Sequence, residues 1–229
     1  MSKKNTAATI ATIVVAVLAI ATTLFLLYQT SQQQIQDNQY NYVPSDEINE
    51  EMNMNAVTLI KNNCEVFRIF LQYGLPHQAE PYNNVPEDGY YTVKSDNYKT
   101  ISDIETLVNS TFVEKEAKRI LTNINGDNVA VYAEETDDDG NKGIGLDVSM
   151  VDENGRFKAI AYDYTWSNAK FTLHPKSNTE CDIIVELNPA EETSSAENAS
   201  SGSDDSNTKK VTANMLKVNG EWRLQKLVY

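Results

Sequence analysis

The N-terminal part of the chain contains one long uncharged apolar run, residues 7–28 (AATIATIVVAVLAIATTLFLLY), whose only polar side chains belong to threonines and the final tyrosine. A helix of this length crosses about 30 Å of hydrocarbon, because each residue adds about 1.5 Å. In a bilayer the backbone polar groups must be paired within the segment, which a helix achieves. The run therefore predicts a transmembrane helix over residues 7–28.

The charges around this run predict its orientation. Lys3 and Lys4 precede it, and no Lys or Arg follows until Lys61. Positive charge is retained in the cytoplasm, so we expect residues 1–6 inside and the chain after Tyr28 outside the cell membrane. A cleaved signal peptide is the alternative, with an apolar core of roughly 7–15 residues. The longer run, which ends in LFLLY without an A-x-A pattern, favours an uncleaved, single-pass anchor.

Composition restricts the partners of the exposed part. The chain has 33 acidic and 19 basic residues, a formal charge of −14. Such a surface repels phosphate backbones and favours basic partners, so nucleic-acid binding is not expected. Cys64 and Cys181 are the only cysteines. Their spacing does not suggest a metal site, and outside the cytoplasm they can either pair or remain as two buried thiols.

Residues 29–46 are polar and rich in Gln and Asn, which predicts a stalk. Residues 47–229 have the length of one globular domain. From Glu47 to about Tyr73 apolar residues recur at spacings of three and four, which predicts a long amphipathic helix. Gly74 and Pro76 are typical of the end of such a helix.

The middle of the chain predicts a loop over residues 75–89, a short strand over residues 90–93, and two short helices. Ser102 with Glu105, and Thr111 with Glu114, have the spacing of capping boxes, in which a hydroxyl and a carboxylate pair with the first free backbone N–H groups. These pairs predict helices over residues 103–109 and 112–122.

After Asn125 the sequence is typical of antiparallel strands separated by turns. Asp139-Gly140, Asn154-Gly155 and Asn219-Gly220 are dipeptides that accept the positive φ of tight turns. Residues 190–208 are too polar to join a core and are predicted to be a disordered insert. We expect an α+β fold, with a long helix and two short helices packed on one curved antiparallel sheet. The strands are expected at residues 128–134, 144–151, 157–166, 169–174, 181–187, 210–218 and 221–228.

The acidic run Asp137, Asp138, Asp139 with Gly140 resembles part of a calcium loop. Counted from Asp137, however, the sixth residue is Lys142 instead of glycine and the twelfth is Val148 instead of glutamate. This register predicts a solvated acidic hairpin tip, and we expect neither a metal ion nor a cofactor.

The sequence gives equally little support for catalytic residues as for a metal site. In residues 159–166 the alternation places Ile160, Tyr162, Tyr164 and Trp166 on one face and Asp163 on the other. A general base at Asp163 would need a partner group that tunes its pKa, and His77 and His174 are expected in proline-bearing turns with no carboxylate at a fixed spacing. The aromatic face is expected to pack under the helices, and we do not expect an enzyme.

Tyr90, Tyr91 and Tyr98 are expected on or next to loops, where exposed tyrosines often serve as contact anchors. Half-buried tyrosines at the rim of a small domain would give the same pattern. Together with the three aspartates Asp137, Asp138 and Asp139, these tyrosines are the candidate partner-binding residues.

Residues 88–121 (DGYYTVKSDNYKTISDIETLVNSTFVEKEAKRIL) resemble the Gram-positive extracytoplasmic family of cell-wall DL-endopeptidase inhibitors (IseA-like). The shared pattern is a Gly-Tyr-Tyr strand, a turn with a lysine, a Ser-Asp-Ile helix and a Thr-Phe helix. The closing VNGEWRLQKLVY is similar to the last hairpin of cystatin-like and NTF2-like domains. The resemblance implies a non-enzymatic domain that binds NlpC/P60-type peptidoglycan hydrolases and blocks their active-site groove. Family members are usually secreted, whereas this chain has a predicted anchor.

Three functions follow as hypotheses. The first is a membrane-anchored protein that binds a basic cell-wall hydrolase or another envelope protein. The second is a structural NTF2-like subunit of a secretion or conjugation assembly, which would share the layout of a short tail, one span and an outer domain. The third is a small-molecule or enzymatic pocket in the concave face of the sheet, for which the sequence alone supplies no polar cluster.

Overall fold

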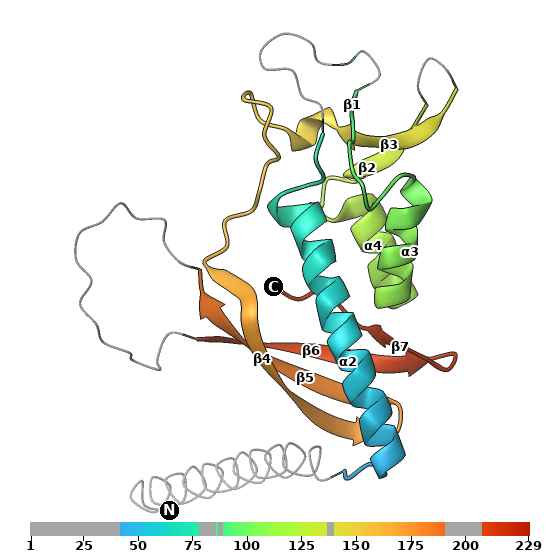
Figure 1. The fold of residues 1–229 in the computed structure, drawn as a ribbon, viewed down its shortest axis with the longest axis vertical. Helices are drawn as coiled ribbons and strands as arrows, with labels where there is room; N and C mark the ends of the chain where they lie inside the picture. Colours follow the sequence, from blue (N-terminus) through green and yellow to red (C-terminus); the bar gives the residue numbers. More distant parts are fainter. Residues whose placement is uncertain (1–41, 78–85, 87–88, 137–139, 191–207) are drawn as a thin grey trace, which may run out of the picture. The chain divides into compact units, whose positions relative to one another are not determined.

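The structure is a computed structural model that describes residues 42–77, 86, 89–136, 140–190 and 208–229. The chain divides into two units at Val43, and the unit Pro44–Tyr229 has an α+β fold of helices and antiparallel strands, as predicted (Figure 1). The predicted tail, transmembrane helix and most of the stalk lie outside the described residues. Within the described residues, none of the helices has both the length and the apolar character needed to cross a membrane.

The long predicted helix is confirmed. Helix α2 (Asp46–Phe67) continues into a π-helical turn, η1 (Arg68–Gln72). The hydroxyl of Ser45 accepts a hydrogen bond from the N–H of Ile48 at 3.5 Å, and Asp46 and Glu47 suit the positive end of the helix dipole. Gly74 ends the helix with a φ of +67°, a conformation that glycine adopts without steric cost. The switch to π geometry was not predicted.

The two short helices form, but their predicted capping boxes are wrong. Helix α3 (Ile101–Thr111) begins after Thr100, and the carboxylate of Asp103 accepts the backbone N–H of Thr100 at 2.9 Å. Thr100 and Asp103 therefore form the box, two residues before the predicted pair, and allow Ile101 to pack against the core. Thr111 ends α3, with its hydroxyl bonded to the carbonyl of Leu107 at 2.7 Å. Helix α4 (Glu114–Asn123) starts after Val113.

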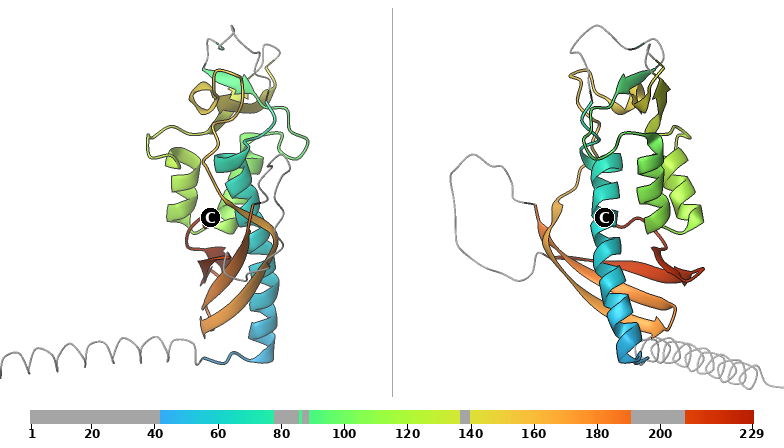
Figure 2. Two further views of the ribbon diagram at one scale, coloured as in Figure 1. Left: turned by 90° about the vertical axis from the view of Figure 1, so that its left-hand side faces the viewer. Right: turned by 45° about the vertical axis from the view of Figure 1, so that its right-hand side comes forward.

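The strands form two antiparallel sheets instead of the single sheet that was predicted. The three-stranded sheet has the order β1-β3-β2 and lies beyond the C-terminal end of α2. The four-stranded sheet has the order β4-β5-β6-β7, is curled, and lies along the N-terminal half of α2 (Figures 1 and 2). The strands are β1 (Tyr90–Thr92), β2 (Tyr132–Thr136), β3 (Lys142–Asp147), β4 (Tyr164–Ser177), β5 (Glu180–Pro189), β6 (Lys209–Val218) and β7 (Glu221–Leu224).

The largest difference from prediction is the segment before β4. The alternation of residues 157–166 predicted a strand, but the segment up to Asp163 connects the two sheets, and the N–H of Ile160 bonds to the carbonyl of Leu71 at 2.9 Å. At the other end, β7 stops at Leu224 instead of residue 228. The side chains of Asn63 on α2 and Glu116 on α4 bond the backbone of the last residues in place of a strand partner. The Asn219-Gly220 turn is confirmed, with φ of 52° and 86°.

One hydrophobic core joins the elements. The junction between α3 and α4 pairs with β7, where the N–H of Val113 bonds to the carbonyl of Leu224 at 2.9 Å. The largest fully buried side chains come from the helices, from both sheets and from the segments that connect them, so both sheets share this core: Met52, Phe67, Ile69, Phe70, Leu75, Ile104, Phe112, Ile120, Ile144, Leu146, Ile183 and Leu187.

Candidate functional site

Tyr90 and Tyr91 lie side by side in sequence on β1, opposite Asp147 and Leu146 of β3. A Cβ added to Gly145 of β3 would lie 2.8 Å from the Cβ of Tyr90, so Gly145 provides the space in which Tyr90 sits on the sheet. Tyr91 packs against the core, with its ring centroid 6.1 Å from that of His77. Both tyrosines are half-buried.

Tyr98 occupies a different place, a cleft of about 560 Å³ along α2. Its hydroxyl donates to Oε1 of Glu65 at 3.0 Å. Glu65 in turn accepts two hydrogen bonds from the guanidinium of Arg68, at 2.8 and 2.7 Å. Such a two-bond pair is stronger than a single contact and holds both side chains in one orientation. The remaining lining residues are Lys61, Asn62, Cys64, Asn97 and Leu107.

Several ionisable groups of the cleft have pKa values shifted from their ordinary values. The hydrogen bonds from Arg68 hold the pKa of Glu65 below its usual range, so the carboxylate stays charged. Burial raises the pKa of Tyr98 to about 12, and burial raises the pKa of the Cys64 thiol to about 12 as well. Cys64 is therefore a poor nucleophile, since the thiolate is the reactive form. The cleft offers a charged carboxylate and guanidinium for binding.

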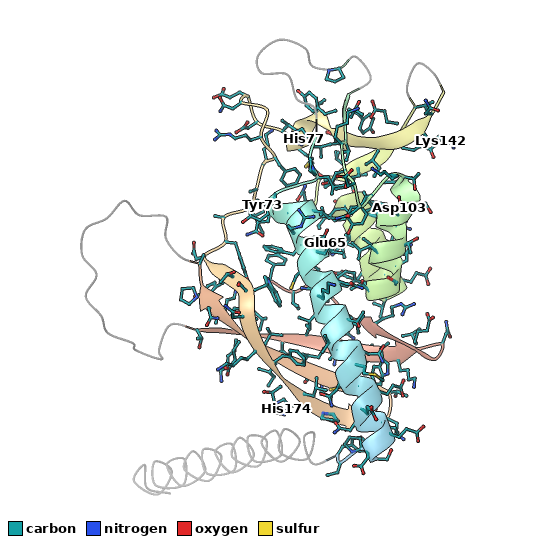
Figure 3. The ribbon with its side chains drawn as sticks, viewed as in Figure 1. Glu65, Tyr73, His77, Asp103, Lys142 and His174 are labelled. Atoms are coloured by element: carbon teal, nitrogen blue, oxygen red, sulfur yellow. The ribbon has the colours of Figure 1, made fainter. Side chains whose placement is uncertain are left out.

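The predicted aspartates Asp137, Asp138 and Asp139 lie outside the described residues. The strands on either side of them are described: Thr136 pairs with Lys142, and Glu134 forms an ion pair with Lys142 at 2.9 Å. Figure 3 shows Lys142 at this end of the three-stranded sheet. The sheet thus brings the β1 tyrosines and the acidic β2 strand together, while Tyr98 belongs to the cleft on α2.

His77 contacts backbone carbonyls, and His174 lies within a strand. His77 lies within hydrogen-bond distance of two carbonyls, that of Leu75 at 3.0 Å and that of Gly155 at 3.1 Å. His174 lies on β4 opposite Asp182, so its predicted position in a turn is wrong (Figure 3). Asp163 is exposed and its backbone carbonyl accepts the N–H of Ala190. Among the described residues no group of three or more His, Cys, Asp or Glu side chains is placed to hold a metal ion.

The structure also bears on the two alternatives for the cysteines, a disulfide or two buried thiols. Cys64 lies on α2 and Cys181 near the start of β5, and both are free thiols. Burial raises the pKa of Cys181 to about 11. The structure therefore supports two separate, protonated thiols over a disulfide.

The cleft's main pair, Glu65 and Arg68, was missed in the sequence. The signal was available, because a glutamate and an arginine three residues apart share one helix face. It was not distinctive, since such pairs are common on exposed helices.

No family model matches the chain, and no curated protein matches it.

Proposed function

We propose that this chain is a membrane-anchored, extracytoplasmic binding protein that inhibits or regulates a peptidoglycan DL-endopeptidase of the NlpC/P60 type. The proposal combines the family resemblance of residues 88–121 with one structural observation. Tyr90 and Tyr91 lie on a short sheet beyond the C-terminal end of α2, whereas the predicted stalk reaches the helix at Asp46, its N-terminal end (Figure 1).

This arrangement suits a protein that acts away from its anchor. Helix α2 has 22 residues and η1 has 5, so together they extend about 40 Å at 1.5 Å per residue. A binding sheet at the far end of this helix would be held clear of the point where the stalk joins the domain. The cystatin-like or NTF2-like identity of the fold remains part of the proposal.

Charge would contribute mainly to the rate of association. A chain with a formal charge of −14 attracts a basic groove over a distance set by the ionic strength. Aromatic side chains on the sheet would then provide buried contact area, which chiefly slows dissociation.

The direct test is inhibition. A domain that begins at Ser45, with its fold checked by circular dichroism, should slow muropeptide release by a purified NlpC/P60 endopeptidase. The inhibition should weaken as the salt concentration rises from about 50 to 300 mM, because the Debye length falls below about 8 Å above physiological ionic strength. Absence of inhibition of several such enzymes at micromolar folded domain would reject the proposal.

Two glycines on β3 provide a matched test of the sheet. Gly145→Ala would force the backbone near Tyr90 to move, whereas a Cβ at Gly143 meets no atom of the described residues within 4 Å. We expect Gly145→Ala and Tyr90→Ala to raise the inhibition constant and Gly143→Ala to leave it unchanged. Equal effects of the two glycine variants would show that the position of Tyr90 does not matter.

The acidic residues and the tyrosines should affect different rate constants of binding. Reversing the charge of Asp137, Asp138 and Asp139 should slow association more than it speeds dissociation, and Tyr91→Ala should do the opposite. Surface plasmon resonance on an immobilised hydrolase separates the two rates.

The topology can be tested in cells. Protease added to intact cells should remove the domain if residues 7–28 anchor it outside. If the domain becomes sensitive only after lysis, the topology is reversed and an envelope hydrolase cannot be its partner.

A structural subunit of an envelope assembly is the second candidate. The observation that favours it is the curled four-stranded sheet along a long helix, an arrangement compatible with NTF2-like domains. Affinity capture from envelope extracts distinguishes the candidates, because one recovers a hydrolase and the other recovers components of a membrane machine.

A further inference from the structure

A second pocket, of about 580 Å³, lies between the end of η1 and the start of β4. Its volume is within the range of roughly 300–1,000 Å³ that is typical of small-molecule sites. It is distinct from the cleft of Tyr98 and from the sheet that contains Tyr90 and Tyr91.

The lining combines aromatic rings with uncharged polar groups. Tyr73, Tyr162 and Tyr164 supply the rings. Among the described residues, no Asp, Glu, Lys, Arg or His side chain lines the pocket. The polar lining consists of amides and hydroxyls: Gln72, Thr165, Ser167, Asn168 and Asn188.

Two of the tyrosines are held rigidly. The ring centroids of Tyr162 and Phe67 are 5.0 Å apart in an edge-to-face arrangement, and Tyr162 and Tyr164 are 6.1 Å apart. Nζ of Lys209 lies 5.1 and 5.2 Å from the centroids of Tyr162 and Tyr164, so this ammonium is engaged with both rings. A preformed wall of this kind costs a ligand little ordering energy.

Tyr73 differs from these two rings because 65% of its surface is exposed. It follows the π-helical turn, whose irregular geometry ends α2 and is frequent at functional sites (Figure 3). A large exposed ring at the mouth of a polar pocket is available to stack on a ligand.

A bulge in β4 forms the opposite wall. Thr165 pairs with Asn188 and Lys170 with Glu186, so residues 166–169 stand opposite the single residue Leu187. Asn168 in this bulge has a φ of +58°, which is uncommon for a residue other than glycine. Bulges redirect side chains and are frequent next to binding sites.

The hydroxyl of Tyr162 adds a further polar group beside the pocket. It is buried and has no hydrogen-bond partner among the described residues. Burial raises the pKa of Tyr162 to about 12, so this hydroxyl remains protonated at neutral pH.

These features together select a class of ligand. An apolar ligand would leave the amides and hydroxyls unpaired. A charged ligand would find no opposite charge among the described lining residues, and the nearest ammonium, Nζ of Lys209, is already engaged with the rings of Tyr162 and Tyr164. A sugar ring has an apolar face that packs on an aromatic ring and an edge of hydroxyls that bond amides. We infer that this pocket binds a neutral saccharide, stacked on Tyr73 and hydrogen-bonded to Asn168 and Asn188. The inference is independent of the proposed hydrolase inhibition.

The test uses the full chain in a zwitterionic detergent that lacks a sugar headgroup. Triacetylchitotriose and maltotriose, both neutral, serve as probes, and a trigalacturonate is the anionic comparison. Calorimetry or saturation-transfer NMR should detect a neutral probe with a Kd at or below the millimolar range. Stronger binding of the trigalacturonate, or binding of neither neutral probe at about 10 mM, would overturn the inference.

Two variants assign the binding to this pocket. Tyr73→Ala removes the exposed ring and should weaken binding about tenfold, the effect of losing about 1.4 kcal/mol. Asn168→Gly removes an amide while it keeps the positive φ, and should weaken binding several-fold.

Asn219→Gly is the matched control, because Asn219 also has a positive φ, of 52°, but lies in the turn between β6 and β7. Binding in the control should equal that of the unmodified chain. Binding that is equally strong in all three variants would place the saccharide elsewhere and overturn the inference.

Discussion

Two buried polar side chains hold the last residues of the chain. Asn63 on α2 donates from Nδ2 to the carbonyl of Val228 at 2.8 Å and accepts the N–H of Val228 at 3.0 Å. Glu116 on α4 accepts the N–H of Leu227 at 2.9 Å. These bonds replace the ladder that β7 would otherwise continue, since buried backbone groups must be paired.

Removing the side chain of Asn63 should therefore be costly. Asn63→Ala leaves the N–H and carbonyl of Val228 without partners, which costs about 1–3 kcal/mol. For a domain of this size the melting temperature should fall by about 3–10 °C. Thermal unfolding followed by circular dichroism measures the change. Asn62→Ala, at the neighbouring half-buried position, is the control, and an equal loss in both variants would contradict the role of Asn63.

Glu116 should make stability depend on pH in the acidic range. Burial opposes its charge, but two hydrogen bonds from Arg119, both at 2.8 Å, and the bond from Leu227 outweigh this and lower its pKa. A lowered folded-state pKa gives stabilisation that is complete above the unfolded value of about 4.3 and is lost as the pH falls through the folded-state value.

The comparison is between the unmodified chain and Glu116→Gln. The difference in their unfolding free energies should be largest at neutral pH and should shrink as the pH falls below about 4. Urea denaturation at several pH values gives these free energies. A difference that stays constant down to pH 3 would mean that Glu116 contributes by its shape alone.

At the scale of elements, the end of α2 determines where the chain goes next. The π-helical turn brings Leu71 to Ile160 and leaves Tyr73 exposed, and Gly74 then ends the helix beside Phe157. The helix period predicted the helix and its glycine stop, because both depend on neighbouring residues. The π turn depends on packing against the connecting segment, which lies far away in the sequence.

Two glycines with positive φ allow the cost of backbone strain to be measured separately from the cost of steric crowding. A Cβ at Gly74 would lie 2.5 Å from Cδ2 of Phe157, while a Cβ at Gly220 meets no atom of the described residues within 4 Å. Gly220→Ala should cost about 1 kcal/mol from backbone strain alone. Gly74→Ala should cost more, about 2–4 kcal/mol, because strain and steric overlap add. Urea denaturation compares them, and equal losses would show that Phe157 moves aside freely.

At the scale of the whole molecule, β5 and β6 pair along their length on either side of the predicted insert, and the pairing ends with Leu187 opposite Lys209. Residues 191–207 lie outside the described residues, so their predicted disorder stays a prediction. The buried residues of this sheet lie on both sides of this segment in the sequence: Ile183 and Val185 precede it, and Ala213 follows it.

The insert should therefore be dispensable for folding. Replacing residues 190–208 with a short glycine-containing turn removes almost no apolar side chain, so the free energy of unfolding should change by less than about 1 kcal/mol. The melting temperature should shift by no more than about 2–4 °C. A larger loss, seen by calorimetry, would mean that the segment packs on the domain.

The candidate sites were only partly predictable. The β1 tyrosines were predicted as candidates, but the cleft of Tyr98 depends on Glu65 and Arg68 from a helix that ends well before Tyr98 in the sequence. The saccharide pocket joins residues of η1, β4 and β5. The aromatic alternation of residues 159–166 was noticed, yet it predicted a strand under the helices, because sequence alone does not show which partner a segment pairs with.

What the sequence determined by itself was local: the long helix and its glycine end, the Asn219-Gly220 turn and the α+β class, since these follow from period, caps and turn residues a few positions apart. Only the tertiary structure decided the division into two sheets and the bonds that hold the C-terminus. Asn63 and Val228, for example, are 165 positions apart. Such contacts form because distant buried groups compete for the same few partners, and that competition is resolved only when the whole chain packs.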